Sequence, residues 1–273
     1  MRLRYADACR MCGTELAAGA SAVYERASKT VRCTECIPEV ATTAPELDEL
    51  AESPVEPMAG TAGASARREF ERRKTRREER IHANHPKLGG LILALSDEPQ
   101  STRAWATGAA GEERLGAVLD SLNSPLARVL HDRRIPRTRA NIDHIVVCSG
   151  GVLVIDAKKY QGRPHLRVEG GILRERTEKL MVGSRDATKL VDGVHKQVGL
   201  VRAALGDETP VPVRGFLCFV NADWPLIGGS FNTRSVSVLW PKKLASIVSE
   251  PGPLSESEVA AAHQRLADAF PIA

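Results

Sequence analysis

The stretch NIDHIVVCSGGVLVIDAKKY, from Asn141 to Tyr160, decides the fold of this chain. Its two apolar runs are joined by a Ser-Gly-Gly turn, which predicts an antiparallel hairpin. In that pairing, Asp143 on the first strand and Asp156 on the second come to the same end of the hairpin. Strand alternation turns Asp156 and Lys158 toward one face. Charges placed so near a core are unfavourable unless something compensates them.

A divalent cation between the two carboxylates would compensate this charge. Mg²⁺ takes oxygen ligands, commonly one or two carboxylates together with waters and a phosphate oxygen. A neighbouring lysine then positions or deprotonates an attacking water and offsets charge on the phosphorus. The triplet Asp156-Ala157-Lys158 is the single acid-x-Lys in the sequence, and it closes an apolar strand. We therefore expect a Mg²⁺ or Mn²⁺ site here.

The sequence from about residue 108 to residue 221 resembles the nuclease-related (NERD) domain of the PD-(D/E)xK nuclease superfamily. The resemblance is carried by GAAGEERLGAVLDSL, VLHDRRIP, NIDHIVV, GVLVIDAKKYQG and a later VHKQVGLVRAAL. It implies an α/β fold, a restriction-endonuclease-like mixed sheet flanked by helices. It also implies a divalent-metal-dependent phosphodiesterase that acts on DNA.

The same resemblance assigns roles to individual residues. It matches the family's functional positions to Glu112, Asp143, Asp156, Lys158 and Gln197. The two aspartates would bind Mg²⁺ with the Ala157 carbonyl, and Glu112 would bind the metal or a bridging water. Lys158 would act on the nucleophilic water, and Gln197 would orient water or phosphate. Asp156 stands at the acidic position before x-Lys, where many members of the family have Glu. Asp keeps the negative charge, but its side chain is one methylene shorter.

Two neighbours compete for these roles. Glu113 could replace Glu112, and Lys159 could replace Lys158. Alternation along the strand favours Lys158, because Lys159 would point to the opposite face. His144 also points away from Asp143 by alternation, and we expect it to be a hydrogen-bonded structural residue.

The first 36 residues contain Cys9, Cys12, Cys33 and Cys36, spaced C-x2-C, a gap of 20, then C-x2-C. This spacing predicts a tetrahedral zinc site with a short hairpin between the two pairs, a module that resembles a zinc ribbon. Such a small module depends on the metal to fold. Free or disulfide-bonded thiols are the alternative, which a reducing location disfavours.

Residues 41–63 form an Ala-, Pro- and Glu-rich linker, and the run from Arg67 to Arg80 holds eight Lys/Arg against four Glu. We expect a helix there, either simply solvated or lying on nucleic-acid phosphates. The domains expected are thus 1–40, a zinc module; 41–84, linker and basic helix; and 85–273, the nuclease-like domain. The residues expected to contact nucleic acid are Arg72, Arg73, Lys74, Arg133, Arg134, Arg137 and Arg139. A solvated loop is the alternative for the last four.

The remaining elements follow from apolar periodicity. We expect helices at 108–122, 187–205 and 255–270, and strands at 127–130, 213–220 and 236–240. A strand or short helix is expected at 88–95, and a further hairpin pairs 163–168 with 172–175 around Gly170-Gly171. Trp105, Trp224 and Trp240 are interpreted as packing residues rather than base-stacking platforms.

Composition fits a globular chain with room for more than one domain. The 273 residues are 42% hydrophobic and 26% charged, with a net charge of +4. That balance permits a nucleic-acid partner without requiring one. The longest apolar run, 88–95, is too short to cross a membrane. No secretory signal is visible after the first charges, so we expect a cytoplasmic location without a membrane partner.

Three functions are compatible with these features. The first is a metal-dependent DNA nuclease for processing or repair, delivered by the zinc module and basic helix. The second is a non-catalytic module with a nuclease-like fold that binds nucleic acid or protein. The third is a hydrolase that uses the same site on RNA or nucleotides.

Overall fold

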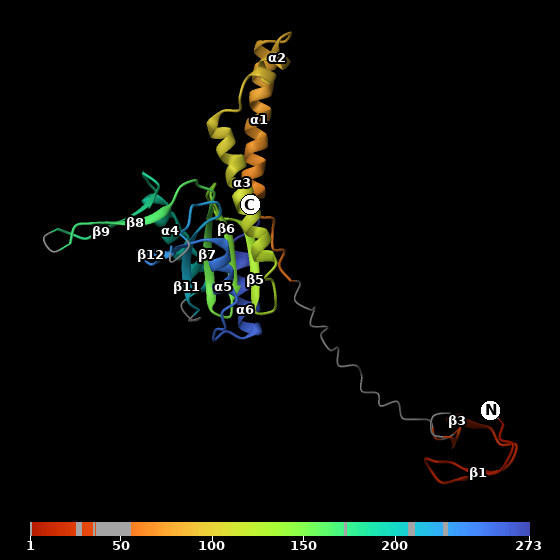
Figure 1. Cartoon of the computed structure of the whole chain (residues 1–273). Coiled ribbons are helices and arrows are strands. Elements are labelled where there is room, and N and C mark those ends of the chain that lie inside the picture. The colour runs from red at the N-terminus through yellow and green to blue at the C-terminus, as the bar shows by residue number, and fades with distance from the viewer. Residues whose placement is uncertain are drawn as a thin grey trace. The chain divides into compact units, whose positions relative to one another are not determined.

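The structure is a computed structural model. It describes residues 2–25, 29–34, 36, 56–171, 174–206, 211–225 and 229–273. The chain divides into two compact units, residues 1–55 and residues 56–273 (Figure 1). None of the described helices is both long enough and apolar enough to cross a bilayer.

The N-terminal unit consists of two short hairpins. Strand β1 (Asp7–Ala8) pairs with β2 (Glu15–Leu16), and β3 (Ala22–Glu25) pairs with β4 (Thr30–Cys33), both antiparallel. The second pair is the hairpin predicted between the cysteine pairs, with Tyr24 opposite Val31. Its core holds only a few small apolar side chains, namely Leu3, Ala22 and Val31 with Leu16 against them.

A six-stranded mixed sheet forms the centre of the larger unit. Its strands are β5 (Ala127–Arg134), β6 (Asn141–Cys148), β7 (Gly151–Lys158), β11 (Val213–Phe219), β12 (Phe231–Thr233) and β13 (Val236–Leu239). Their order is β12-β13-β11-β7-β6-β5. Strands β7, β11 and β13 are parallel to one another, whereas β5, β6 and β7 form an antiparallel meander. The predicted mixed α/β fold is therefore confirmed.

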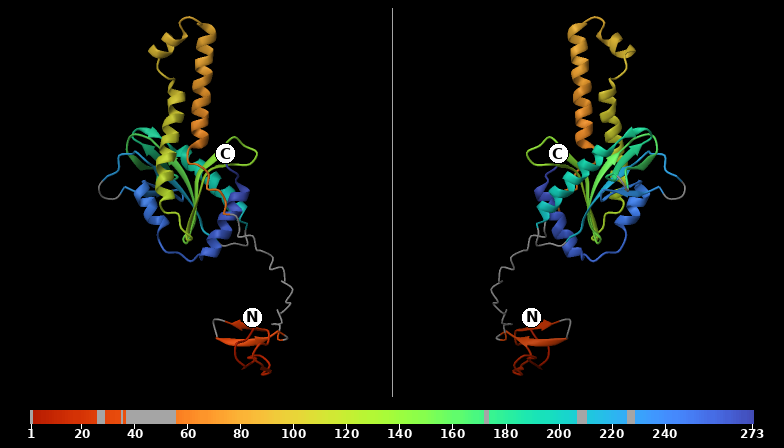
Figure 2. Two further views of the ribbon diagram at one scale, coloured as in Figure 1. Left: turned by 90° about the vertical axis from the view of Figure 1, so that its right-hand side faces the viewer. Right: turned by 90° about the vertical axis from the view of Figure 1, so that its left-hand side faces the viewer.

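Helices cover both faces of this sheet. Helices α4 (Thr188–Leu205) and α6 (Glu256–Ala269) pack on one face, and α3 (Gln100–Asp120) and α5 (Pro241–Val248) pack on the other (Figure 2). Strand β7 serves both cores, because Val152 and Val154 face α4 while Leu153 and Ile155 face α3. Burial on both faces explains the unbroken apolar runs of the central hairpin.

The turn between β6 and β7 requires glycine. Val147 pairs with Val152 and Cys148 with Gly151, as the predicted hairpin register requires. Gly151 has φ +115°, and a Cβ there would collide with the carbonyl oxygen of Pro212. A side chain at this position would therefore be strained and would push β7 away from the segment that leads into β11.

Two further helices project from the sheet with the first part of α3. Helix α1 (Ala64–Asn84) runs beside α3, and α2 (Gly89–Leu95) lies at the tip (Figures 1 and 2). An ion pair of 3.0 Å between Arg77 and Glu98 ties α1 to the segment before α3. The basic run therefore forms a helix, as expected, and it packs within the larger unit.

A second, three-stranded sheet corrects one expectation. It consists of β8 (Pro164–Glu169), β9 (Thr177–Val182) and β10 (Arg185–Asp186). The prediction that 172–175 would form the return strand was wrong, because pairing resumes only with Thr177 opposite Glu169. Residues 172–173 lie outside the described residues.

The last two long helices agree with their predictions. Helix α6 begins at a capping box, in which Ser255 accepts from the Glu258 N–H and the Glu258 carboxylate accepts from the Ser255 N–H. This reciprocal arrangement satisfies two free donors at the helix start. Helix α4 lies where it was expected and buries Val191, Val194, Val198 and Val201.

Candidate active site and cysteine cluster

The candidate active site lies where β6 and β7 separate. Regular pairing ends at His144 opposite Ile155. Beyond that point the Asp143 carboxylate accepts a hydrogen bond of 2.9 Å from the backbone N–H of Ala157. Asp143 and Asp156 are both buried at this end of the hairpin. The structure thus brings together the two carboxylates that the sequence placed at one end.

Lys158 lies directly against these carboxylates. Its ammonium contacts the carboxylate of Asp156 and lies 3.9 Å from Oδ2 of Asp143. It also donates to the carbonyl oxygen of Ala157 at 3.2 Å. Lys159, by contrast, packs its Cβ against Gly111 of α3. Of the two lysines, Lys158 is the one that meets both aspartates.

The electrostatics of this group show an excess of negative charge. Burial raises the pKa of Asp143 well above its usual range, and the charge of Asp156 raises it further, while Lys158 opposes both. For Lys158, burial alone would lower the pKa, but the carboxylates of Asp156 and Asp143 outweigh burial and raise it. Two buried carboxylates share a single ammonium here. An additional cation would relieve their repulsion.

Glu112 reaches the same region from α3. Its Oε2 is buried without a hydrogen-bond partner among the described residues. Burial raises the pKa of Glu112 to about 7, with Lys158 opposing this and Asp132 and Asp156 reinforcing it. Glu113 is engaged elsewhere, because it accepts from Arg67 Nε at 2.9 Å. The free carboxylate near the aspartates is therefore that of Glu112.

Gln197 lies on α4, next to the first residue of β6. Its Nε2 donates weakly to the carbonyl oxygen of Asn141 at 3.5 Å, and its Oε1 is buried without a partner among the described residues. Asn141 precedes Asp143 by two residues. The Gln197 amide therefore lies close to the end of the sheet that carries Asp143, and its Oε1 remains free to accept a hydrogen bond.

A cleft of about 830 Å³ opens over this end of β7. It is lined by α3 and by the residues that follow the strand, among them Arg103, Thr107, Glu112, Lys158, Tyr160 and Gln161. Sequence reasoning missed Arg103 and Gln161. The α3 positions one and two turns before Glu112 are Gly108 and Ala104, which carry no polar group to signal a cleft.

The seven basic residues predicted to contact nucleic acid have different environments. Arg133 is only 3% exposed. It donates to the carbonyl oxygens of Phe270, at 3.4 Å, and of Met58. The structure therefore places it in the interior, where a guanidinium can satisfy two chain segments but cannot reach a ligand. Arg137 is exposed with φ +63°.

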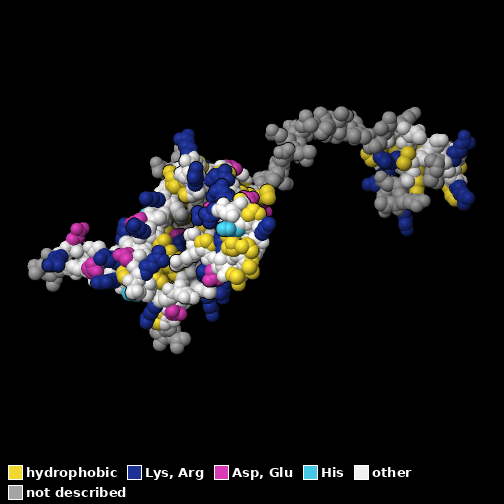
Figure 3. Space-filling view, turned by 90° about the horizontal axis from the view of Figure 1, so that it is seen from above, with side chains coloured by type: hydrophobic (Ala, Val, Ile, Leu, Met, Phe, Trp, Pro, Cys, Tyr) yellow, Lys and Arg dark blue, Asp and Glu magenta, His cyan; other side chains and the backbone are white. Residues whose placement is uncertain are grey.

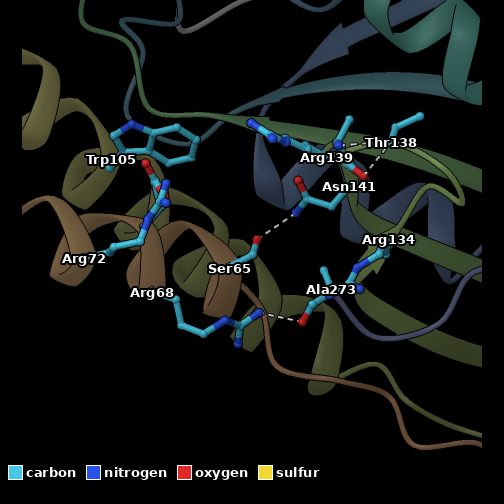
Figure 4. A pocket seen from close by; sticks show the side chains of 11 residues that line it. Ser65, Arg68, Arg72, Trp105, Arg134, Thr138, Arg139, Asn141 and Ala273 are labelled. Atoms are coloured by element: carbon cyan, nitrogen blue, oxygen red, sulfur yellow. Dashed lines mark hydrogen bonds and ion pairs between the residues drawn. The ribbon is translucent and has the colours of Figure 1, made fainter.

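Several of the other basic residues surround a second cavity, of about 520 Å³, which we call the arginine pocket (Figure 4). Its lining includes Arg68, Arg72, Arg134, Arg139, Trp105 and Asn141. Arg73 lies nearby, 5.5 Å over the Trp105 ring, and Lys74 is partly buried on α1. Trp105 is 39% exposed, so its interpretation as a packing residue was wrong. Its spacing of seven residues from Glu112 was a signal that it shares a helix face with the site.

A buried hydrogen-bond network that the sequence did not suggest holds α1 beside β6. The carboxylate of Asp132 accepts from the backbone N–H and from the hydroxyl of Ser65, each at 2.6 Å, and from the side chain of Asn141. Asp132 has φ +50°, in the left-handed region, and is fully buried. The start of α1 is therefore fixed next to the first residue of β6.

His144 is the structural residue that we expected. Its Nδ1 lies 2.8 Å from Nδ1 of His131, whose Nε2 lies 2.8 Å from Asp120 Oδ1. If Nε2 of His131 donates to Asp120, then Nδ1 of the neutral His131 ring is an acceptor. In that case Nδ1 of His144 is the donor in the contact between the two rings. Both rings are buried between α3 and the sheet.

The N-terminal cysteines form a compact cluster. The ligand atoms of Cys9, Cys12, Cys33 and Cys36 all lie within 4.8 Å of one another, with 3.8 Å between the sulfurs of Cys12 and Cys33. Four thiolates about 2.3 Å from a tetrahedral zinc would be separated by about 3.8 Å. The backbone N–H of Cys33 donates to the Cys9 sulfur at 3.3 Å, and that of Cys36 to the Cys33 sulfur at 3.2 Å. The cluster is thus compatible with a structural zinc ion.

Electrostatics within the cluster favour a cation among these sulfurs. The N–H of Cys33 contributes most to lowering the pKa of the Cys9 thiol, to about 6, whereas its neighbour Cys12 contributes most to raising the pKa of Cys36. Without a cation the four thiolates would repel one another. Within the described part of the chain, this is the single group of three or more His, Cys, Asp or Glu ligands that lie so close.

Comparison with known proteins gave one match. Residues 107–220 match the family model described as the nuclease-related domain, NERD. No curated protein and no solved structure matches the chain. The chain therefore contains a nuclease-related domain, and the resemblance predicted from residue 108 to residue 221 is confirmed. The cysteine cluster, α1 and α6 lie outside the matched residues.

Proposed function

We propose that this protein is a divalent-metal-dependent nuclease that hydrolyses phosphodiester bonds in DNA, in DNA processing or repair. The observation that carries the proposal is the position of the Lys158 ammonium. It contacts the carboxylate of Asp156 and lies 3.9 Å from that of Asp143, where β6 and β7 separate. A match to the nuclease-related domain over the same residues supports it.

Asp143 and Asp156 would hold Mg²⁺ or Mn²⁺, with the carbonyl oxygen of Ala157 as a third ligand. The residues fit such an ion, because two buried carboxylates repel each other here and Glu112 offers an unpartnered buried oxygen. Oxygen-only donor sets of this kind suit Mg²⁺ and Mn²⁺. The bound ion would polarise the phosphate and lower the pKa of a coordinated water.

The role of Lys158 follows from its charge. Its pKa is raised, so the ammonium remains protonated at neutral pH. A protonated ammonium cannot remove a proton from water, but it stabilises negative charge that develops on the phosphate oxygens. We therefore favour an electrostatic role for Lys158, together with positioning of the attacking water.

Glu112 and Gln197 would hold that water. The free Oε2 of Glu112 and the free Oε1 of Gln197 are both acceptors, and they belong to different helices, α3 and α4. Two fixed acceptors orient the hydrogens of a water so that its lone pair points at phosphorus. Hydrolysis then forms one phosphorus–oxygen bond to the water and breaks the bond to the leaving sugar oxygen, which takes up a proton.

The basic side chains at the surface would bind the DNA backbone. Arg72, Arg134 and Arg139 line one pocket, with Arg73, Lys74 and Arg137 nearby in the chain. Such contacts give affinity that falls with salt and does not depend on sequence. The zinc module would add a second contact to nucleic acid, and RNA is the alternative substrate.

Plasmid nicking tests the proposal. Supercoiled DNA would be incubated with Mg²⁺ or Mn²⁺ and the wild-type protein, Asp143→Asn, Asp156→Asn or Lys158→Met. We expect each change to lower the rate by about 100-fold or more, since each removes charge from the reacting centre. The matched controls are Glu113→Gln and Lys159→Met, which should keep the rate within a few-fold. Equal rates for all six proteins would refute the assignment.

One observation favours a second candidate function, a non-catalytic module that binds nucleic acid or protein. Lys158 already contacts Asp156 and lies near Asp143, so the ammonium partly neutralises the carboxylates that would bind the metal. Calorimetric titration with Mg²⁺ separates the two candidates. Salt-dependent DNA binding without Mg²⁺ binding and without a cleaved product would establish the binding module.

A further inference from the structure

The arginine pocket carries positive charge that the protein does not neutralise. Among the described residues, Arg134 and Arg139 have no acidic partner. Arg68 donates to the backbone oxygen of Ala273 at 2.5 Å. Arg72 is the exception, because its Nε donates to Glu69 at 2.8 Å. An anion is therefore the ligand that the lining favours.

An aromatic ring completes the pocket. Trp105 is 39% exposed and shares the lining with Arg139, and Arg73 lies 5.5 Å over the ring. The other two tryptophans pack against each other, with ring centroids 5.1 Å apart. Figure 4 shows the Trp105 indole, Arg72 and Arg139 around the same opening. Cations that hold phosphate beside an aromatic side chain are the combination with which proteins bind unpaired nucleotides.

The pocket also lies close to the candidate active site. Asn141 belongs to its lining and precedes Asp143 by two residues of β6, a rise of about 7 Å. Trp105 precedes Glu112 by seven residues of α3, which is about 10 Å along the helix and nearly the same direction around it. A strand whose phosphate is at the aspartates would thus bring its neighbouring nucleotide to the pocket.

The cavity has a suitable size, and its walls are held in place. A volume of about 520 Å³ lies within the range of pockets that bind small molecules. Asp132 fixes the start of α1 to Asn141 through Ser65. Viewed from above, Lys and Arg outnumber acidic side chains on the face that carries the projecting helices (Figure 3). The surroundings therefore favour the approach of a polyanion.

We propose that the arginine pocket binds one unpaired nucleotide adjacent to the bond that is cut, with Trp105 stacked on the base and Arg134 and Arg139 on the phosphate. The substrate is then a single strand, or a single-stranded end or flap on a duplex. The position of this nucleotide next to a cleaved bond rests on the proposed nuclease function. Nucleotide binding by the pocket can be measured without that function. In a duplex the neighbouring base pairs stack on each base and cover the π-face that Trp105 needs.

Binding by fluorescence anisotropy tests the pocket. Labelled single-stranded DNA, the same sequence as RNA, and a blunt duplex would be titrated with the full chain in the absence of divalent ions. We expect Trp105→Leu to weaken single-strand binding by about 5- to 100-fold, and Trp105→Phe to retain most of it, because stacking is worth about 1–3 kcal/mol per base. Arg139→Ala should lower the salt dependence by about 0.7 in logarithmic slope.

Lys242→Ala is the matched control, since Lys242 is an exposed cation on α5 and does not belong to the pocket lining. It should bind nearly as the wild type does. Quenching of tryptophan fluorescence by the oligonucleotide, lost in Trp105→Phe, provides a readout that a folding defect would not imitate. Unchanged single-strand affinity in both Trp105→Leu and Arg139→Ala would overturn the proposal, as would a blunt duplex that binds as tightly as the single strand.

The outcome does not depend on plasmid nicking. A protein that fails to nick DNA but loses single-strand affinity in Trp105→Leu and Arg139→Ala keeps the pocket and loses the nuclease assignment. A protein that nicks DNA and binds single strands equally well in those variants keeps the nuclease assignment and loses the pocket. The RNA titration decides which sugar the pocket accepts.

Discussion

The N-terminal unit and the larger unit both gather candidate metal ligands, but they hold them together by different means. In the N-terminal unit the apolar core consists of Leu3, Ala22 and Val31 with one partly buried neighbour. In the larger unit two apolar cores fix β6 and β7 from both faces. A metal in the first unit would therefore organise the fold, whereas the apolar cores of the second unit hold Asp143 and Asp156 together without one.

The largest expected effect is that of zinc removal. Replacing Cys12 and Cys36 by serine, or adding a strong chelator, should unfold the N-terminal unit, since structural zinc contributes about 10–16 kcal/mol to comparable small modules. The larger unit should keep its unfolding temperature. Metal analysis should give one zinc per wild-type chain. A N-terminal unit that keeps protected backbone amides without zinc would show that its small core suffices.

The second effect concerns Glu112. Its pKa is about 7 in the folded protein against the ordinary 4.5, so folding favours the protonated form. The associated stability is fully present below about pH 4.5 and is lost as the pH rises through about 7. At pH 8 without divalent ions, Glu112→Gln should therefore stabilise the larger unit, by up to about 3 kcal/mol.

Denaturant unfolding measures this effect. The gain in Glu112→Gln should be largest at pH 8 and small at pH 4. Glu113→Gln is the matched control, because Glu113 is paired with Arg67 and should give no gain. Equal stability of Glu112→Gln and wild type at pH 8 would mean that burial does not destabilise the charged form of Glu112.

The third effect is that of the network around Asp132. Asp132→Ala should destabilise the larger unit by about 1–3 kcal/mol, because it leaves buried donors of Ser65 and Asn141 without an acceptor. The residue also has φ +50°, which Asp and Asn tolerate better than Ala. Asp132→Asn should recover part of the loss. Urea unfolding measures the loss of stability in both variants. A smaller loss in Asp132→Ala than in Asp132→Asn would contradict this prediction.

The smallest effect is expected for the exposed ion pair between Arg67 and Glu113. Breaking it with Arg67→Gln should change the free energy of unfolding by less than about 1 kcal/mol, because solvent and salt screen such pairs. The difference should shrink further at high salt. A large and salt-independent loss would mean that the contact between α1 and α3 depends on this pair.

The hairpin was predictable because its information is local. The apolar runs, the Ser-Gly-Gly turn and the period of two along a strand place Asp143 and Asp156 at one end with Lys158 beside them. The cysteine hairpin was predictable for the same reason, since its spacing alone indicates a shared ligand. Glu112 and Gln197 came from the family resemblance rather than from any local pattern.

The arginine pocket was not predictable, because its walls come from four distant segments. Arg68 belongs to α1, Trp105 to α3, Arg139 to the β5–β6 loop and Ala273 to the residues after α6. No periodicity links such positions. Arg133 was misplaced for a related reason: the carbonyl oxygens that it satisfies, at Met58 and Phe270, are far away in the chain. The return strand of β8 was placed too early in the sequence, because pairing with β8 resumes only at Thr177.

Helix α6 has a consequence for how this domain can be isolated. Its residues Val259, Leu266 and Phe270 belong to the core that α4 and the central strands form, and β13 pairs along β11. Both elements lie after residue 220, where the family match ends. A fragment trimmed to residues 107–220 would expose the apolar part of the sheet that α6 covers and the edge of β11 that pairs with β13, and would be prone to aggregate. The stretch that defines the family is therefore shorter than the stretch that must fold together.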